Sequence, residues 1–508
     1  METINVTKAS GEQEPFKETK LRRTLEATGA DSKVVEQVIA SIRKLLYDGI
    51  STQRITEEAF RQLSRKSNYN GLKIPQPEHT GPTKVGNKTI DTLQRHAFDY
   101  FVHETNPNNG LVADNSQLDS PASIASVGFA LGVYLVGVKR GWMSRNEAIK
   151  RTLSVLHFFW GSEQSTAPNA TGYKGFYYHF LDMHSGQRAA KCELSTIDTG
   201  ILLAGILVSA AFFDRDSKEE KEIRELSDAL YRRVDWEWAC NGDATITHGW
   251  TPENGFLPYR WEGYDEAALL YLLGLGSPTH TLSPESYSAW TSTHQWKKIY
   301  GIEFAYGGPL FIHQYSHIWV DFREIQDVFM REKGIDYFEN SRRATYVQQE
   351  YAVRNPLEFN GYGQNFWGIT ASDGPGWMTR KVNGVERTFF GYTARGAPYG
   401  PDDGTVAPWA VVAALPFAPE IVLPTIRYFQ DVYPQVTGKY CLRCSFNLSY
   451  PHNDANSGWT SSFHYGINLG PVVLMCENYR SGLIWQLMRD CKYIKNGLKK
   501  AGFENGWL

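Results

Sequence analysis

From about residue 91 onward, strongly apolar segments alternate with charged ones, and most are long enough for a helix of several turns. The apolar segments, which predict buried helices, include 122–143, 194–214 and 263–276. The charged segments, which predict outer helices, include 144–159 and 217–236. Ser144 followed by Glu147 is typical of a capping box at a helix start. Paired helices of this kind can close into a double ring of six and six. We therefore expect a mostly α fold, an (α/α)6 barrel or toroid, whose loops form a basin over one end.

Residues 1–66 follow a different pattern. A short alternating segment near the start predicts a strand, and apolar residues then recur at helical spacing between 34 and 46 until Gly49 breaks the helix. A strand pair with a few helices predicts a small α+β module. Residues 67–90 are rich in proline and glycine, so we expect a linker before the large domain at 91–508.

The composition is ordinary for a soluble chain, since 42% of the 508 residues are hydrophobic and 21% are charged. A net charge of −3 creates no field that would attract nucleic acid or an anionic membrane. The first residues lack the apolar core of a secretory signal, and the longest apolar run, 200–213, is too short to span a bilayer. Six scattered cysteines fit a reducing compartment, so we expect a cytoplasmic protein without nucleic-acid or membrane partners.

Two predicted inner helices begin with carboxylates. Glu193 precedes one of them and Asp198 follows inside its apolar run, while Glu262 and Glu266 stand beside Trp261 at the start of another. The helix dipole also favours acidic residues in a first turn, but it explains neither the neighbouring aromatic residues nor a carboxylate within an apolar run. Acids at two helix mouths can face each other across the basin. Such a pair is what glycoside hydrolysis needs, namely one acid for the leaving oxygen and one base or nucleophile for the anomeric carbon.

A second polar segment carries His313 and His317 at the spacing of a two-histidine zinc face. Gln314 occupies the position that glutamate takes in the zinc motif, so we expect hydrogen bonds to sugar hydroxyls from His313, Gln314 and Arg323 instead. The single C-x-x-C pair at 441–444 has no second pair with zinc spacing and predicts buried thiols. We therefore expect no metal. The sequence also lacks a P-loop, a dinucleotide-binding glycine motif and a nucleophile elbow.

Several ordered motifs of the large part resemble one known family. They include "GFYYHFLDMHSGQR", "CELSTIDTGILLAG", "WEGYDEAALLYLLGLGSPTH" and "GPVVLMCENYRSGLIW". Residues 91–490 resemble the glucoamylase-like (α/α)6 family that includes bacterial endo-β-1,2-glucanases and the transglycosylase domain of cyclic β-1,2-glucan synthases. The resemblance implies a glycoside hydrolase acting on β-glucans, most of all on β-1,2-linked glucose chains, that needs no cofactor for catalysis. The alternatives are a transglycosylase on the same glucans and a nucleotide-gated glycan-binding protein.

The same resemblance implies residue roles. It makes Glu262 the general acid and Glu193 the second catalytic carboxylate. The residues that it implies around the substrate are Asp198, Glu266, Trp261, Trp319, Trp367, Asp373 and Asp403. Two positions depart from the family pattern, because Cys444 and Asn468 stand where relatives often carry acids. The base is therefore left open between Asp454 and Glu193.

The small module also resembles a known family. Its segments "VTKASGEQEPFKETKLRRTL" and "YDGISTQRI" are similar to the ATP-cone, the nucleotide-sensing module of ribonucleotide reductases. The resemblance implies that Lys8 and Lys20 hold nucleotide phosphates, that Glu14 contacts the nucleoside, and that ATP or dATP is an allosteric ligand. The alternative is that both lysines are ordinary surface residues of a structural module. ATP-cones often mediate self-association, which allows a homo-oligomer.

Overall fold

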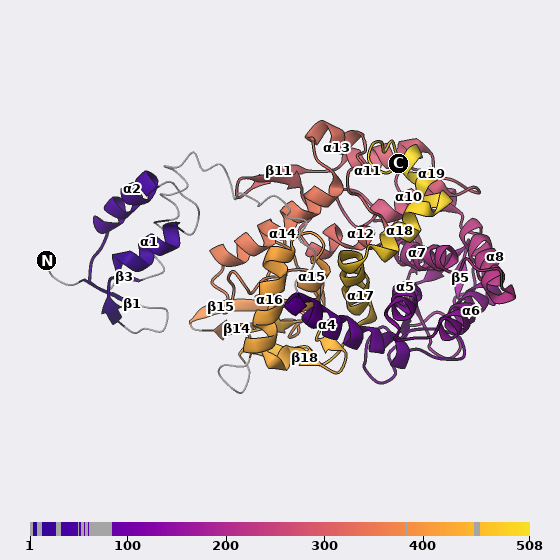
Figure 1. Cartoon of the computed structure of the whole chain (residues 1–508), viewed down its shortest axis with the longest axis horizontal. Coiled ribbons are helices and arrows are strands. Elements are labelled where there is room, and N and C mark those ends of the chain that lie inside the picture. Colours follow the sequence, from indigo (N-terminus) through magenta and orange to yellow (C-terminus); the bar gives the residue numbers. More distant parts are fainter. Residues whose placement is uncertain are drawn as a thin grey trace. The chain divides into compact units, whose positions relative to one another are not determined.

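The computed structural model describes residues 4–7, 13–26, 32–48, 50–51, 55, 59, 84–382, 384–451 and 458–508. The chain divides into two compact units (Figure 1). The small unit comprises Met1–Gln76 with Lys298–Glu303, and the large unit comprises Pro77–Lys297 with Phe304–Leu508. Lys8, Asp454 and most of the expected linker lie outside the described residues.

In the residues that the structure describes, the small unit joins a three-stranded sheet to two helices. Strand β1 (Asn5–Thr7) pairs antiparallel with β2 (Gln13–Pro15) and parallel with β3 (Ile50–Ser51). The helices are α1 (Glu18–Glu26) and α2 (Ser32–Arg43). The buried face of α2 carries Val35, Val38, Ile39 and Ile42, which confirms the helical spacing read from the sequence. The expected α+β module is therefore confirmed.

The large unit is built from two layers of helices. The buried layer comprises α5 (Ile124–Arg140), α7 (Thr196–Phe212), α10 (Ala268–Gly276), α12 (Tyr315–Trp319), α15 (Pro408–Ala413) and α17 (Gly466–Arg480). The outer layer comprises α4 (Lys84–His103), α6 (Arg145–Gly161), α8 (Lys218–Arg232), α11 (Pro284–Ser292), α14 (Tyr337–Arg354) and α16 (Pro419–Val432). Helix α5 packs against α7 and α17, α10 lies between α7 and α12, and α17 contacts α12 and α15. This double ring confirms the expected (α/α)6 fold (Figure 1).

Close contact between α5 and α7 explains two glycines in these helices. A β-carbon built on Gly205 would lie 2.1 Å from the backbone oxygen of Gly128. A β-carbon on Gly128 would lie 2.5 Å from the backbone oxygen of Ile201. Only glycine lets the two backbones touch here, so the buried layer is packed most tightly where these helices meet. The predicted N-cap of α6 is also confirmed, since the Ser144 hydroxyl accepts a hydrogen bond from the backbone of Glu147.

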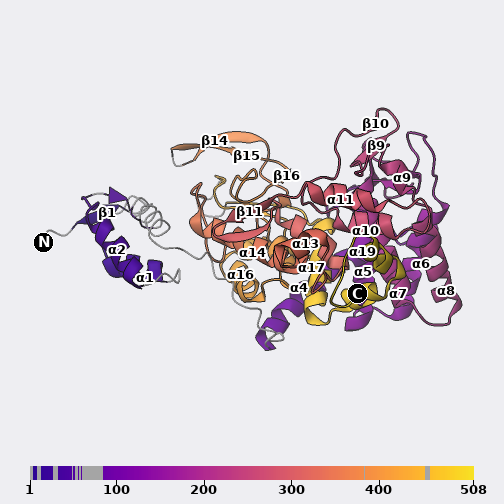
Figure 2. The same cartoon turned by 90° about the horizontal axis from the view of Figure 1, so that it is seen from above.

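Short strands connect the helices at one end of the ring. A five-stranded sheet has the order β10 (Gly255–Phe256), β9 (Gly249–Thr251), β8 (Leu194–Ser195), β6 (Phe176–Tyr178), β5 (Gly172–Tyr173). Further along the chain, β13 (Ala371–Ser372) pairs with β16 (Thr393–Ala394), and β14 (Met378–Val382) pairs with β15 (Val385–Phe389). Figure 2 shows the β9–β10 and β14–β15 hairpins projecting from the same side of the helical layers. None of the described helices has the length and hydropathy needed to cross a membrane.

Candidate active site

A cavity of about 610 Å³ opens among the loops and strands that precede the buried helices. Its polar lining consists of Asp114, Asn115, His179, Glu193, Ser195, Asp198, His248 and Glu266. Its aromatic lining consists of Phe180, Trp261, Phe311, Tyr315, Tyr392 and Tyr465. Asp198 and Tyr315 lie in the first turns of α7 and α12, and most of the others come from loops and short strands before α5, α7, α10 and α17, so the cavity lies where the buried helices begin. Carboxylates beside aromatic walls in a concave site of this size are typical of a site for a small polar ligand with apolar faces.

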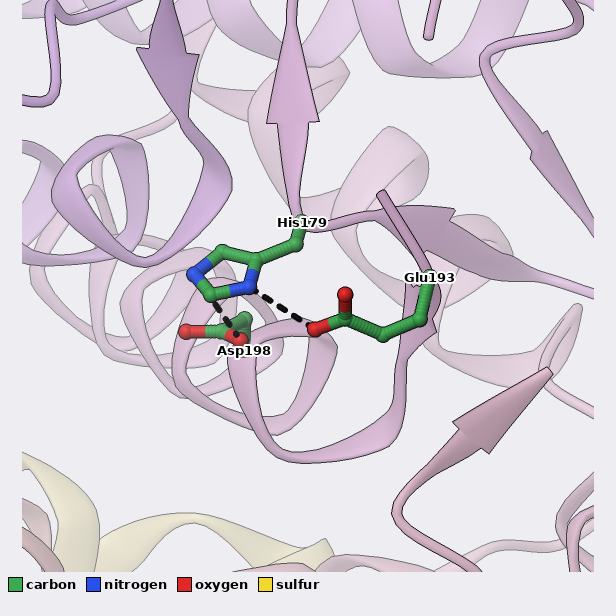
Figure 3. Close-up of side chains that lie close together, drawn as sticks. All are labelled: His179, Glu193 and Asp198. Atoms are coloured by element: carbon green, nitrogen blue, oxygen red, sulfur yellow. Dashed lines mark hydrogen bonds and ion pairs between the residues drawn. The ribbon is translucent and has the colours of Figure 1, made fainter. Parts of the chain in front are cut away.

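His179 joins two of the carboxylates (Figure 3). Its Nδ1 lies 2.8 Å from Oε1 of Glu193, and its Nε2 lies 3.6 Å from Oδ2 of Asp198. The local fold explains the arrangement. His179 follows β6, Glu193 precedes β8, and these two strands are paired, while Asp198 lies in the first turn of α7. Ser195 caps α7 and donates its hydroxyl to Asp198 over 2.5 Å.

The charges of this cluster follow from its partners. Burial works to lower the pKa of His179, but the negative charges of Asp198 and Glu193 outweigh burial and raise it to about 9. Burial works to raise the pKa of Glu193, but the hydrogen bond and charge of His179 hold it below its ordinary value. At neutral pH His179 is therefore an imidazolium hydrogen-bonded to Glu193.

His179, Glu193 and Asp198 could in principle hold a metal ion, because their ligand atoms all lie within 4.8 Å of one another. Among the residues that the structure describes, they are the group that meets this criterion. The 2.8 Å separation between His179 Nδ1 and Glu193 Oε1 is that of a hydrogen bond and needs a proton on the nitrogen. A metal ion could bind that nitrogen only by displacing the proton. The geometry fits a charged hydrogen-bonded cluster better than a ligand set.

Glu266 has the opposite environment. Burial, together with the negative charges of Asp198 and Asp265, raises its pKa well above the ordinary value. Over the residues that the structure describes, no hydrogen bond reaches its carboxyl group, while Ser316 holds its backbone oxygen at 2.8 Å. Glu266 therefore holds its proton more tightly than Glu193, although both line the same cavity.

Glu262, the expected general acid, lies elsewhere. It is exposed, it does not line the cavity, and its carboxylate accepts a hydrogen bond from Thr245 over 3.2 Å. The sequence predicts a helix that begins at 263, directly after Glu262, whereas α10 begins only at Ala268 and Gly263 has a positive φ of 85°. In this irregular segment the two glutamates do not share a face, and only Glu266 points into the cavity.

Trp261 lies in the cavity wall, as expected of a substrate-contacting residue. Its ring stacks on His248 with a centroid distance of 3.9 Å and an interplanar angle of 21°. Its indole nitrogen donates to Thr196 over 3.0 Å, which fixes the ring against the start of α7. The cavity thus brings together Glu193, Asp198, Glu266 and Trp261 of the residues that the sequence indicated.

The expected polar contacts around α12 lie outside the cavity lining. His313 is fully buried and donates from Nε2 to a loop carbonyl over 3.1 Å. Burial lowers its pKa to about 4, so it is neutral. Gln314 is fully buried and donates to a carbonyl of α15 over 2.7 Å, and Arg323 pairs with Asp321 over 2.6 Å. His313 and Gln314 are thus held in the interior by backbone carbonyls and stabilise the fold.

The remaining expected contacts also belong to the interior. Trp319 stacks on an aromatic ring of α5, and Trp367 donates to a threonine of α16 over 2.9 Å. Asp403 forms a fully buried ion pair with Arg395. Asp373 accepts a hydrogen bond from a serine of the loop before α17 over 2.9 Å and does not line the cavity. Trp319 and Trp367 are therefore packed in the hydrophobic core and do not contact the cavity.

Other cavity residues had no signal in the sequence. His179 and His248 stand in long aromatic loops and Asp114 stands in a polar loop, each without a partner at a recognisable spacing. Burial raises the pKa of Asp114, and Asn115 donates to it over 3.0 Å. Strand pairing brings His179 next to a carboxylate fourteen positions away, and no periodic pattern predicts that contact.

The two positions that depart from the family pattern contact each other. The side-chain amide of Asn468 donates to the sulfur of Cys444 over 3.0 Å, and both residues are buried. Burial raises the pKa of the Cys444 thiol to about 12, so it carries no charge. Neither side chain lines the cavity.

In the small unit, the Lys20 ammonium lies 3.9 Å from the Glu14 carboxylate. The two residues expected to contact nucleotide are thus close to each other, on α1 and β2. Lys8 lies outside the described residues.

Comparisons with known proteins agree on both units. Residues 258–492 match the Glycoamylase family model, described as "Putative glucoamylase", and residues 4–73 match the ATP cone domain model. An exo-β-1,2-glucooligosaccharide sophorohydrolase (non-reducing end) from Parabacteroides distasonis is 27% identical over 447 residues, which are 81% of this chain and 57% of that relative. The chain therefore spans little more than half of that protein.

Solved structures agree with the fold. A "putative glucoamylase" from Bacteroides fragilis is 28% identical with a TM-score of 0.73, covering 85% of this chain and 100% of that one. An endo-β-1,2-glucanase from Chitinophaga pinensis, in complex with sophorotriose and glucose, is 25% identical with a TM-score of 0.73, covering 83% of this chain and 99% of that one.

Proposed function

We propose that this chain, which carries a glycoamylase-family domain and an N-terminal ATP cone, is a glycoside hydrolase that cleaves β-1,2-linked glucans. The observation that carries the proposal is one cavity lined by two carboxyl groups in opposite environments: burial raises the pKa of Glu266, while His179 at 2.8 Å holds the pKa of Glu193 low. The sophorohydrolase and the endo-β-1,2-glucanase to which the chain is similar act on this linkage, which supports the choice of substrate.

Glu266 is the general acid of this proposal. A carboxyl group that keeps its proton near neutral pH can deliver it to the oxygen of the glycosidic bond as that bond breaks. Its raised pKa and its place in the cavity lining support this role. Because no protein group holds the carboxyl within the described chain, it is available to a substrate oxygen.

Glu193 is the second catalytic carboxylate. Its side chain is 31% exposed, and its pKa is lowered by His179 despite burial, so it can act on water or on the anomeric carbon. Asp198 is a positioning residue, since it is buried, holds the Ser195 hydroxyl and faces the other side of the imidazolium. Trp261 and the other aromatic residues of the lining offer flat apolar surfaces for the faces of glucosyl rings.

Glycosyl transfer is the second candidate reaction. The observation that favours it is the contact between Asn468 and Cys444, two neutral side chains where the family pattern often has acids. If one of those acids activates water in relatives, the enzyme described here relies on Glu193 alone. A saccharide hydroxyl can then compete with water for the glycosyl group. Incubation with β-1,2-glucan separates the reactions, because hydrolysis raises the number of reducing ends and transfer redistributes chain lengths without raising it.

The test of the proposed function uses the two glutamates of one segment. Purified full-length protein is incubated with β-1,2-glucan, and cleavage and transfer products are measured for wild type, Glu266→Gln and Glu262→Gln. We expect the first variant to lose turnover by about 10²–10⁴-fold while its circular dichroism is unchanged. We expect Glu262→Gln to stay within about threefold of wild type, since an exposed contact with one hydroxyl contributes little. Normal turnover by Glu266→Gln would overturn the assignment.

We further propose that the ATP cone binds ATP or dATP and that this binding changes glucan turnover. The match of residues 4–73 to the ATP cone model and the pairing of Lys20 with Glu14 support the proposal. Isothermal titration with each nucleotide, for wild type and Lys20→Ala, tests binding, and the glucan assay with and without nucleotide tests control. Size-exclusion chromatography under the same conditions tests self-association. A cytoplasmic location belongs to this proposal, because the nucleotide pool that such a domain senses is inside the cell.

A further inference from the structure

An exposed tryptophan stands next to the cavity wall. Trp377 is 71% exposed and directly precedes β14. One side of its ring packs on Phe390, with a centroid distance of 5.4 Å and an interplanar angle of 56°. A β-carbon built on Gly391 would lie 2.8 Å from the indole nitrogen, so the ring also rests on the backbone there. The indole is therefore supported from behind while most of its surface faces solvent.

The support behind this ring is rigid. Arg395 and Asp403 form an ion pair in which both side chains have 0% exposure. Asp403 accepts from the backbone nitrogen of Phe390 over 2.9 Å, and Arg395 donates to the backbone oxygens of Phe390 and Gly391 over 3.2 and 3.1 Å. Removing either charge would leave the other buried and unpaired, so this pair holds the loop firmly in place. A surface fixed in this way loses little conformational entropy when a ligand binds.

The exposed ring continues the aromatic lining of the cavity. Tyr392 follows Gly391 directly, lines the cavity and is 53% exposed. On another part of the rim, Tyr259 is 66% exposed, and its ring lies 6.0 Å from that of His248 in the lining. Exposed aromatic rings thus occur at both the β9–β10 and β14–β15 sides of the opening, and Figure 2 shows these hairpins on the same side of the molecule.

We propose that Trp377 and Tyr392 form an outer binding platform for glucosyl residues beyond the cavity, and that this platform makes the enzyme favour longer glucan chains. The proposal rests on the proposed function. The flat carbon-bound faces of pyranose rings pack well on indole and phenol rings, and a supported, solvent-facing tryptophan supplies such a surface without rearrangement. A chain whose scissile bond reaches Glu266 extends past Tyr392 to Trp377, whereas a short oligosaccharide ends inside the cavity.

The test measures kcat/KM against chain length. A series of β-1,2-glucooligosaccharides, from the shortest that wild type cleaves up to a long polymer, is assayed with wild type and Trp377→Ala. We expect kcat/KM of the variant to fall about tenfold on long chains through a higher KM, and by less than about twofold on the shortest substrate, because one lost stacking contact is worth roughly this factor. Equal losses at all lengths, or no loss on long chains, overturn the proposal.

Two matched variants sharpen this test. Gly391→Ala keeps the Trp377 indole but shifts it, because the added β-carbon would lie 2.8 Å from the indole nitrogen, so we expect a smaller loss in the same direction, again confined to long chains. Trp160→Ala removes another exposed tryptophan, 46% exposed on α6 and backed by Arg233 at 4.2 Å, and we expect no change at any length. A loss in Trp160→Ala equal to that in Trp377→Ala overturns the specific role of Trp377.

A binding measurement separates failure of the platform from failure of the proposed function. Electrophoresis in gels containing β-1,2-glucan compares the retardation of wild type, Trp377→Ala and Trp160→Ala. If wild type is retarded but cleaves no glucan, the proposed function fails, and reduced retardation of Trp377→Ala alone still supports the platform. Equal retardation of all three proteins, or no retardation of wild type, overturns the platform.

Discussion

Two buried helices begin at the cavity, and they begin in different ways. Helix α7 starts directly after Ser195, whose hydroxyl bonds the backbone of Asp198, so the acid lies in a regular first turn. Helix α10 starts after Ala267, which has no side chain that can cap, and the acids before it lie in an irregular segment. A capped start fixes the direction of each side chain in the first turn. At an uncapped start, the conformation of the preceding loop sets the direction of each side chain. In the loop before α10, Glu266 lines the cavity and Glu262 does not.

Glu266→Gln is the test of the proposed function described above. Among the other variants, we expect the largest loss of activity from Glu193, which directly precedes β8 and the capped start of α7. We expect Glu193→Gln to lower kcat on β-1,2-glucan by about 10²–10³-fold, because the amide can neither accept a proton from water nor attack carbon. Steady-state kinetics measures the change. A control is Glu253→Gln in the turn between β9 and β10, which removes a carboxylate that is 41% exposed and paired with Arg188, and which should leave kcat near that of wild type. A smaller effect for Glu193→Gln than for this control contradicts the assignment.

The difference between the two helix starts also shows what a sequence can predict. Apolar runs predict the buried helices and their pairing with charged ones, and they place Asp198 near the start of a buried helix, because these signals are local. The sequence does not predict that Glu262 lies outside the cavity lining, since the apolar pattern marks where a helix runs but not how the preceding loop turns at Gly263. The role of His179 depends on pairing between distant strands, which no local pattern encodes.

The next effect is on pH dependence. Because the pKa of Glu193 is lowered, activity should persist below the ordinary titration range of glutamate and fall only when Glu193 gains a proton. As pH rises through about 9, His179 loses its proton, the two carboxylates lose their shared cation, and activity falls. A profile of kcat/KM against pH for wild type and His179→Gln checks this. In the variant we expect the acid limb to move to higher pH, because Glu193 has lost the partner that holds its pKa down. An unchanged acid limb contradicts the role of His179.

The same cluster links stability to pH. The folded-state pKa of His179 is raised from 6.5 to about 9, so its favourable contribution is fully present below pH 6.5 and is lost as pH rises through about 9. Urea unfolding of the full chain at pH 6.5 and at about pH 9.5 should show a loss of stability with pH that is larger in wild type than in His179→Gln. If the free energy of unfolding falls equally in the two proteins between these pH values, protonation of His179 does not stabilise the folded state.

The smallest effect concerns the cap itself. Ser195→Ala should lower the free energy of unfolding by about 1 kcal/mol, because the backbone of Asp198 loses its cap acceptor. The matched control is Ser283→Ala, since Ser283 precedes α11 without a side-chain cap bond and is exposed. Urea unfolding measures both variants. Equal destabilisation would mean that the bond to Asp198 does not stabilise the start of α7.

The central claim is that Glu266 holds a proton in the cavity at neutral pH while Glu193 does not. Infrared difference spectroscopy tests it directly, through the carbonyl band of a protonated carboxyl group in wild type minus each variant. We predict that this band appears at pH 7 in the difference with Glu266→Gln and is absent from the differences with Glu193→Gln and Glu262→Gln. A band in the Glu193→Gln difference, or none in the Glu266→Gln difference, would contradict the account.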